Sequence, residues 1–189
     1  MARPLIVPLL AILVASGCSS YAIPRYGVSA ENVTSLRKLG QKVNVGRFTA
    51  STPGKTEIGC RAAGPVKTPD ERPFEDYIRR ALIDELKVAE MLSDSATVTL
   101  TGNLDRIDFD SMKGEWMMDQ TFTSSNGRSL TVSSTYGFRT GPAFVFHQIG
   151  GQAAADERAC AETAHAFPAA VQVLIGKLVH HPEFAALLR

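Results

Sequence analysis

The sequence has almost no excess of charge of either sign. Its 189 residues contain 20 lysines and arginines against 19 aspartates and glutamates. Proteins that bind nucleic acid or acidic membrane surfaces normally carry a basic patch or an excess of Lys and Arg. Neither is visible in the sequence, so we expect no nucleic-acid partner and no membrane attachment through charge.

A stretch long enough to span a membrane is also missing. An almost unbroken apolar run extends from Leu5 to Val14, which is shorter than the roughly 20 residues that a transmembrane helix needs. Arg3 precedes this run, and small residues follow it up to Cys18. Because this is the order of a secretory signal, the pattern predicts a signal peptide over residues 1–17.

The residues from Leu13 to Cys18, Leu-Val-Ala-Ser-Gly-Cys, resemble the lipobox of bacterial lipoproteins, although Ala15 stands where that family prefers Leu. The resemblance implies cleavage before Cys18, a thioether-linked diacylglycerol on its sulfur and acylation, for example by palmitate, of its new amine. Several acyl chains anchor a protein stably in a membrane, whereas a single chain gives only marginal binding. Ser19 follows Cys18 in the sequence. In enteric-type sorting, an Asp at this position would favour retention in the inner membrane. Because Ser stands there instead, we expect attachment to the outer membrane, facing the periplasm. The alternative is an ordinary signal peptide with an incidental Cys18.

Cysteine is scarce, with three residues in the chain. Once Cys18 is assigned to lipid, Cys60 and Cys160 remain as a pair in an oxidising compartment, and we expect a disulfide between them. Closing a loop of about 100 residues contributes roughly 4.7 kcal/mol in the chain-entropy model. The alternative is two unpaired thiols. A catalytic thiol is less favoured, because His165 lies about 140° round a helix from Cys160.

Familiar catalytic motifs are absent: the sequence has no Gly-x-Ser-x-Gly, no paired Cys-x-x-Cys and no His-Glu-x-x-His. Its acidic residues from 105 to 119 match no calcium loop and suit the wet side of an antiparallel sheet. His180 and His181 would point about 100° apart on a helix. We therefore expect no enzymatic activity, no catalytic residue, no cofactor and no metal site. A hydrolase with dispersed active-site residues is the least favoured alternative. The five acidic residues are Asp105, Asp108, Asp110, Glu115 and Asp119.

Hydrophobic periodicity predicts the secondary structure of the mature chain. Helices are expected over 29–40, 74–92 and from about 156 to 188, and strands over 43–48, 96–110 and a hairpin within 116–138. Residues 19–27 look like a polar tether, and 49–73 like an aperiodic loop. The apolar phase changes between Leu104 and Ile107, so a bulge is predicted near Asp105-Arg106. Arg79-Arg80 lies mostly off the apolar stripe of its helix, which favours a solvated face over a contact site.

The hairpin can be placed to the residue. A two-residue Asn-Gly loop would put the apolar side chains of its two strands on opposite faces. A three-residue loop over 125–127 instead places Phe122 opposite Leu130 and Trp116 opposite Tyr136, so that both apolar sets share a face. We therefore predict the three-residue loop.

The order helix, strand, helix, three strands, helix predicts an α+β fold, in which helices pack on one face of a small, mainly antiparallel sheet and form a two-layer sandwich. The expected organisation is a signal peptide over 1–17, a lipidated tether over 18–28 and a single domain over 29–189. With the lipobox, this layout resembles the YajG-like envelope lipoproteins and, more distantly, the N-terminal α/β domains of the CsgG, LpoB and TolB group, over roughly 43–188.

This resemblance is architectural and assigns no functional residues. It implies a non-enzymatic, lipid-anchored binding or accessory protein of the bacterial cell envelope, with an envelope protein as its partner. The alternative is an oligomeric structural component, in which Phe144-Val-Phe and neighbouring strand edges pair between subunits.

Overall fold

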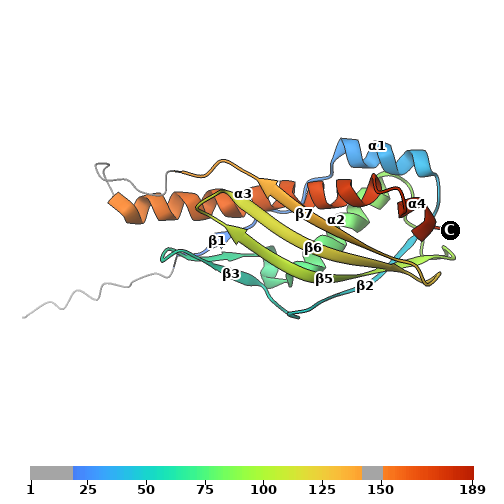
Figure 1. Cartoon of the computed structure of the whole chain (residues 1–189), viewed down its shortest axis with the longest axis horizontal. Helices are drawn as coiled ribbons and strands as arrows, with labels where there is room; N and C mark the ends of the chain where they lie inside the picture. The colour runs from blue at the N-terminus through green and yellow to red at the C-terminus, as the bar shows by residue number, and fades with distance from the viewer. Residues whose placement is uncertain (1–18, 142–150) are drawn as a thin grey trace, which may run out of the picture.

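The computed structural model describes residues 19–141 and 151–189. They form an elongated body in which two sheets pack with helices (Figure 1), so the predicted α+β class is confirmed. The prediction of a single sheet is wrong, because a second sheet of three strands accompanies the main sheet of four. The elements in chain order are β1 (Tyr21–Ala22), α1 (Ala30–Leu39), β2 (Asn44–Ala50), β3 (Glu57–Cys60), β4 (Gly64–Lys67), the 3-10 turn η1 (Pro69–Glu71), α2 (Phe74–Val88), β5 (Thr99–Asp110), β6 (Glu115–Ser124), β7 (Ser129–Gly137), α3 (Gly151–Val179) and α4 (Phe184–Leu187).

The main sheet has the order β2-β5-β6-β7, with β2 parallel to β5 and the other pairs antiparallel. Its register shifts between Leu104 and Arg106, so the predicted bulge is confirmed. The three-residue hairpin loop is confirmed as well, because Phe122 pairs with Leu130. Gly127 adopts the left-handed conformation that this turn requires, with φ of 86°.

Alternation along the strands gives the main sheet one buried and one polar face. Its buried face packs against α2 and α3, and there the fully buried ring of Trp116 lies 4.7 Å from that of Phe167. The indole Nε1 of Trp116 donates a 2.9 Å hydrogen bond to the carbonyl of Thr163 on α3. The opposite face carries hydroxyl pairs such as Thr121 and Thr131, whose Oγ1 atoms are 2.9 Å apart.

Helix α3 is the longest element, with 29 residues, and runs along most of the body (Figure 1). It begins at Gly151, five residues before the predicted start near Asp156, and it continues through Pro168. Pro168 has no backbone N–H and therefore removes one hydrogen bond of the helix. The helix contacts both sheets and thereby joins them.

The small sheet has the order β1-β4-β3. Strand β1 pairs in parallel with β4, with Tyr21 opposite Val66, and the buried Ile23 continues the pairing by donating its N–H to the carbonyl of Lys67 at 2.7 Å. Residues 21–22, within the polar tether expected over 19–27, therefore form a strand, and the expectation of an aperiodic loop over 49–73 is wrong. Strands of two to four residues are too short for hydrophobic alternation to show in the sequence.

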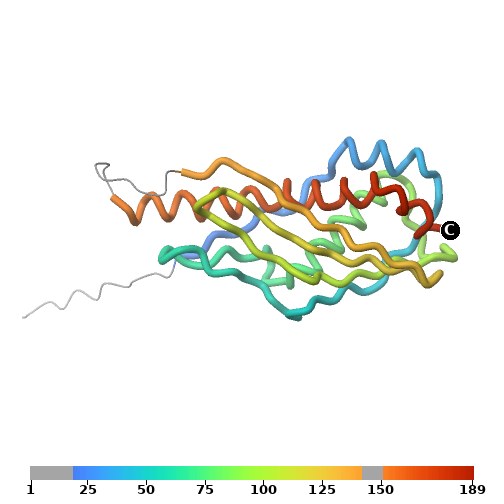
Figure 2. Tube along the Cα trace, viewed as in Figure 1, coloured from blue at the N-terminus to red at the C-terminus, as the bar shows by residue number. Residues whose placement is uncertain are grey.

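The two buried cysteines of the body, Cys60 on β3 and Cys160 on α3, form a disulfide. Their Cα atoms are 5.8 Å apart, a usual separation for such a bond. The predicted pairing is confirmed, and it ties the small sheet to the long helix. Figure 2 shows that the start of the described chain and the β3–β4 hairpin lie at one end of the body, and that the C-terminus lies at the other.

Candidate binding groove along helix α2

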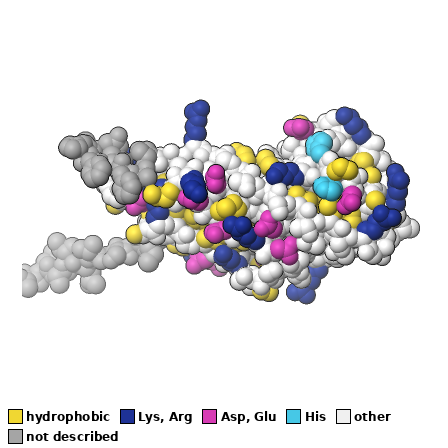
Figure 3. All heavy atoms as spheres, in the orientation of Figure 1, with side chains coloured by type: hydrophobic (Ala, Val, Ile, Leu, Met, Phe, Trp, Pro, Cys, Tyr) yellow, Lys and Arg dark blue, Asp and Glu magenta, His cyan; other side chains and the backbone are white. Residues whose placement is uncertain are grey.

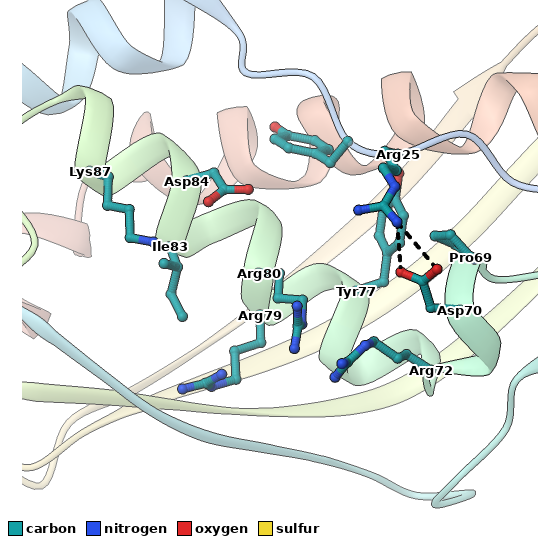
Figure 4. A pocket seen from close by; sticks show the side chains of 11 residues that line it. Arg25, Pro69, Asp70, Arg72, Tyr77, Arg79, Arg80, Ile83, Asp84 and Lys87 are labelled. Carbon is teal, nitrogen blue, oxygen red and sulfur yellow. Dashed lines mark hydrogen bonds and ion pairs between the residues drawn. The ribbon is translucent and has the colours of Figure 1, made fainter.

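A groove of about 420 Å³ lies beside α2, between that helix, the η1 turn and the segment after β1 (Figure 4). The buried stripe of α2 faces the core, so the opposite side of the helix is free to line the groove. Five cations against two carboxylates give the lining a positive balance in an almost neutral chain. The cations are Arg25, Arg72, Arg79, Arg80 and Lys87, and the carboxylates are Asp70 and Asp84.

Several of these cations are only partly neutralised. Arg25 pairs with Asp70 at 3.1 Å, and both side chains are more than half exposed. Arg72 and Arg80 share a single oxygen of Asp76, at 3.3 and 2.8 Å. Exposed pairs of this kind contribute little to stability. Because one carboxylate serves two guanidinium groups, positive charge is left over for a ligand.

Arg79 is held more firmly than its neighbours. Its Nε donates a 2.6 Å hydrogen bond to the carbonyl of Gly46, where strand β2 departs from regular pairing with β5. A second hollow of about 490 Å³ is also lined by this arginine, together with Gly46 and Phe48. In Figure 4 the side chains of Arg72, Arg79 and Arg80 extend to the same side of α2.

Two tyrosines line the inner end of the groove, with their rings edge to face at 6.4 Å. The hydroxyl of Tyr26 donates to the buried carboxylate of Glu85, and that of Tyr77 donates to the carbonyl of Pro24. Burial raises the pKa of both phenols, and the hydrogen bond to Glu85 raises the pKa of Tyr26 further. Both therefore remain neutral hydrogen-bond donors at physiological pH.

The groove offers guanidinium and ammonium donors to a ligand. Such groups recognise carboxylates and phosphates. The lining residues include no Ser, Cys or His that would serve as a nucleophile or its base. Figure 3 shows that Lys and Arg are interspersed with Asp and Glu over the face of the body seen there.

The helical pattern of the sequence places Arg79-Arg80 on a solvated face but does not locate the groove. Its remaining walls come from segments that were predicted to be tether and loop, because Arg25 follows β1 and Asp70 belongs to η1. No motif marks these walls in the sequence, since 45 residues separate Arg25 from Asp70.

The cysteine predicted to carry lipid, Cys18, and the Phe144-Val-Phe segment both lie outside the described residues. The described part of the chain contains no helix long and apolar enough to cross a membrane.

The clustered acidic residues serve local structure. Asp105 accepts hydrogen bonds from Asn103 and Thr121, while Asp108 accepts one from the N–H of Phe109. Asp110 closes the following turn, and hydrogen bonds from the backbone N–H groups of that turn lower the pKa of this carboxyl group. Among the residues outside the two gaps, no group of three or more His, Cys, Asp or Glu could hold a metal ion.

The two adjacent histidines have separate roles. His180 contacts the carbonyl of Gly176 through Nδ1 at 2.7 Å and the Oγ of Ser35 through Nε2 at 3.0 Å. With the proton on Nδ1, this is the hydrogen-bond order of a serine nucleophile and its base, except that a backbone carbonyl replaces the usual carboxylate. No sequence pattern marks this pair, because 145 residues separate Ser35 from His180. His181 instead accepts a hydrogen bond from the N–H of Glu183.

The fold and groove define a small α+β domain with a cationic surface groove. No family model matches the chain, and no curated protein matches it. Among solved structures, protein XCC0632 from Xanthomonas campestris, described as belonging to the family DUF330, is similar over 84% of this chain and 97% of that chain, with 12% identity and a TM-score of 0.38. A likeness of this degree assigns neither a family nor a function.

Proposed function

We propose that this protein is a lipid-anchored, non-enzymatic binding or accessory lipoprotein of the bacterial cell envelope, held at the outer membrane and facing the periplasm. The observation that carries the proposal is the bond between Cys60 and Cys160. It uses both cysteines of the folded body, and a structural disulfide favours an oxidising compartment. Cys18, at the end of a signal-like segment, is then the one cysteine left for lipid.

The groove supports a binding role. Its cations on α2 extend from Arg79 to Lys87, a distance of about 12 Å at 1.5 Å per residue, and Arg72 continues the row before the start of the helix. A row of separated charges suits an extended acidic surface better than a single small anion. We therefore propose a partner that presents carboxylates to this side of α2, where complementary charge would guide its approach.

The oligomeric structural component remains the alternative, although the edges of the main sheet give it little support. On β2, the carbonyl of Gly46 is engaged by Arg79, and on β7, the carbonyl of Ser133 accepts a 3.0 Å hydrogen bond from Lys177. Each contact occupies one edge carbonyl that pairing with another chain would need.

The proposal is tested by replacing Cys18 with Ser and fractionating the cells. We expect the wild-type protein to remain with the outer membrane and to incorporate labelled palmitate, and the variant to incorporate none and leave the membrane fraction. Ser19→Ala is the matched control and should behave like the wild type in lipid labelling. Retention of the Cys18→Ser protein in the membrane fraction would contradict the proposal.

A further inference from the structure

The folded body begins directly after the cysteine proposed to carry lipid. The carbonyl oxygen of Ser19 lies so close to Gly64 that a Cβ added to this glycine would approach it to 1.9 Å. Two residues later, Tyr21 pairs with Val66 in the small sheet. Cys18 is the residue directly before Ser19 in the sequence. No flexible spacer separates the anchor from the body.

The turn between β5 and β6 stands at the same end of the body. The guanidinium of Arg61, in the β3–β4 turn, donates to the carbonyl of Ser111 at 2.8 Å and to its hydroxyl at 3.1 Å. The same group pairs at 2.7 Å with Asp156 in the first turns of α3, and the Arg61 side chain is 9% exposed. These contacts join the two turns and α3 into one rigid end, which we call the anchored end (Ser19, residues 60–64, residues 110–114 and Asp156).

The anchored end presents an apolar side chain to its surroundings. Met112 is 48% exposed and is one of three large exposed hydrophobic residues in the part of the chain that the structure describes. Lys113 beside it has a side chain that is 72% exposed and pairs loosely with Asp110 at 3.7 Å. An apolar side chain next to a long cationic one suits the boundary between lipid tails and headgroups, where the cation reaches back to the headgroups.

The β5–β6 turn holds Met112 in place. The carboxylate of Asp110 accepts hydrogen bonds from the N–H groups of Met112 and Lys113 at 2.9 and 3.0 Å. Gly114 then turns the chain with φ of 74°, and a Cβ there would lie 2.2 Å from the carbonyl oxygen of Phe138. The exposure of Met112 therefore follows from a fixed turn.

We infer that the anchored end rests on the lipid surface, with Met112 in contact with the bilayer interface and the hairpin loop over 125–127 pointing away from it. The inference rests on the proposed lipidation of Cys18 and adds the orientation of the body. Its basis is the absence of a spacer after Cys18, the rigid link from Ser19 to the β5–β6 turn and the exposed Met112-Lys113 pair. The far end carries Asn126, whose side chain binds the carbonyls of Ala186 and Arg189 near the C-terminus.

The test uses the mature, membrane-extracted protein in vesicles of phosphatidylethanolamine and phosphatidylglycerol that contain spin-labelled lipid. Met112→Cys and, as the matched control at the far end, Arg128→Cys are each labelled with a small fluorophore. Cys60 and Cys160 are disulfide-bonded, and Cys18 carries lipid in this protein. The introduced cysteine is therefore the one free thiol in each variant. We expect several-fold stronger quenching by the spin-labelled lipid at position 112 than at 128.

The two proposals fail in different ways. Equal, weak quenching at both positions in protein that is lipidated and vesicle-bound would overturn the orientation and leave the lipoprotein function standing. Shielding of position 112 from both lipid and aqueous iodide would also overturn it, because another protein would then cover this end. Absence of lipid on Cys18, measured by mass spectrometry before reconstitution, would overturn the proposed function. Thermal unfolding of both labelled variants shows whether they fold like the wild type.

Discussion

The hydroxyl of Tyr26 donates a 2.5 Å hydrogen bond to the carboxylate of Glu85, which is fully buried on α2. The same Oε1 atom accepts a 2.9 Å hydrogen bond from the N–H of Ser29, at the start of α1. One carboxylate oxygen thus joins the N-terminal segment and α1 to α2. This contact, together with the pairing of β1, makes residues 19–29 part of the folded body.

Removing the hydroxyl of Tyr26 tests this link. Tyr26→Phe should lower the free energy of unfolding by about 1.5–3 kcal/mol, the usual range for a hydrogen bond to a charged group, as measured by urea unfolding. Tyr21→Phe is the matched control, because the buried Tyr21 hydroxyl has no hydrogen-bond partner among the described residues. The control should change stability little. Equal losses in both variants would contradict the role of Glu85.

The raised pKa of Tyr26 and Tyr77 predicts a loss of stability at high pH. Unfolded tyrosines ionise near pH 10, while burial keeps both phenols protonated in the folded state. Above pH 10 the folded state therefore binds more protons than the unfolded state, and the free energy of unfolding falls as the pH rises. Urea unfolding between pH 8 and 11 should show this fall. A weaker pH dependence is expected for Tyr77→Phe, and an unchanged one would argue against the burial of this phenol.

Charge reversal in the groove tests its proposed affinity for acidic partners. We expect the wild-type domain to bind fluorescent poly-glutamate in a salt-sensitive way, because exposed charges are screened by salt. Arg80→Glu should weaken binding about tenfold, since it removes a cation and adds a repulsive charge. Arg128→Glu makes the same charge change at the exposed hairpin loop and should have a smaller effect. Equal losses would mean that net charge, rather than the groove, governs binding.

The contact between Ser35 and His180 allows a direct test for hydrolase chemistry. We expect this contact to link α1 to the end of α3 without activating Ser35 as a nucleophile. A fluorophosphonate probe should therefore label the wild-type protein no more than Ser35→Ala, as measured by mass spectrometry. Covalent modification of Ser35 that His180→Ala abolishes would revive the hydrolase alternative.

The sequence predicted the elements whose pattern repeats over many residues. The pairing of Trp116 with Tyr136 follows from period-2 alternation and from the turn chemistry of Gly127, both of which are local. The small sheet was missed because strands as short as Tyr21–Ala22 leave no periodic signal. The groove was missed for a different reason: contacts such as Arg25 with Asp70 arise only when distant segments fold together.

Mass spectrometry of the protein purified from cell envelopes measures whether Cys18 carries the membrane anchor. We expect an N-terminal peptide that begins at Cys18 and carries a diacylglyceryl group on its sulfur and an acyl chain on its amine. An N-terminal peptide that carries Cys18 as a free thiol, with no lipid, would contradict it.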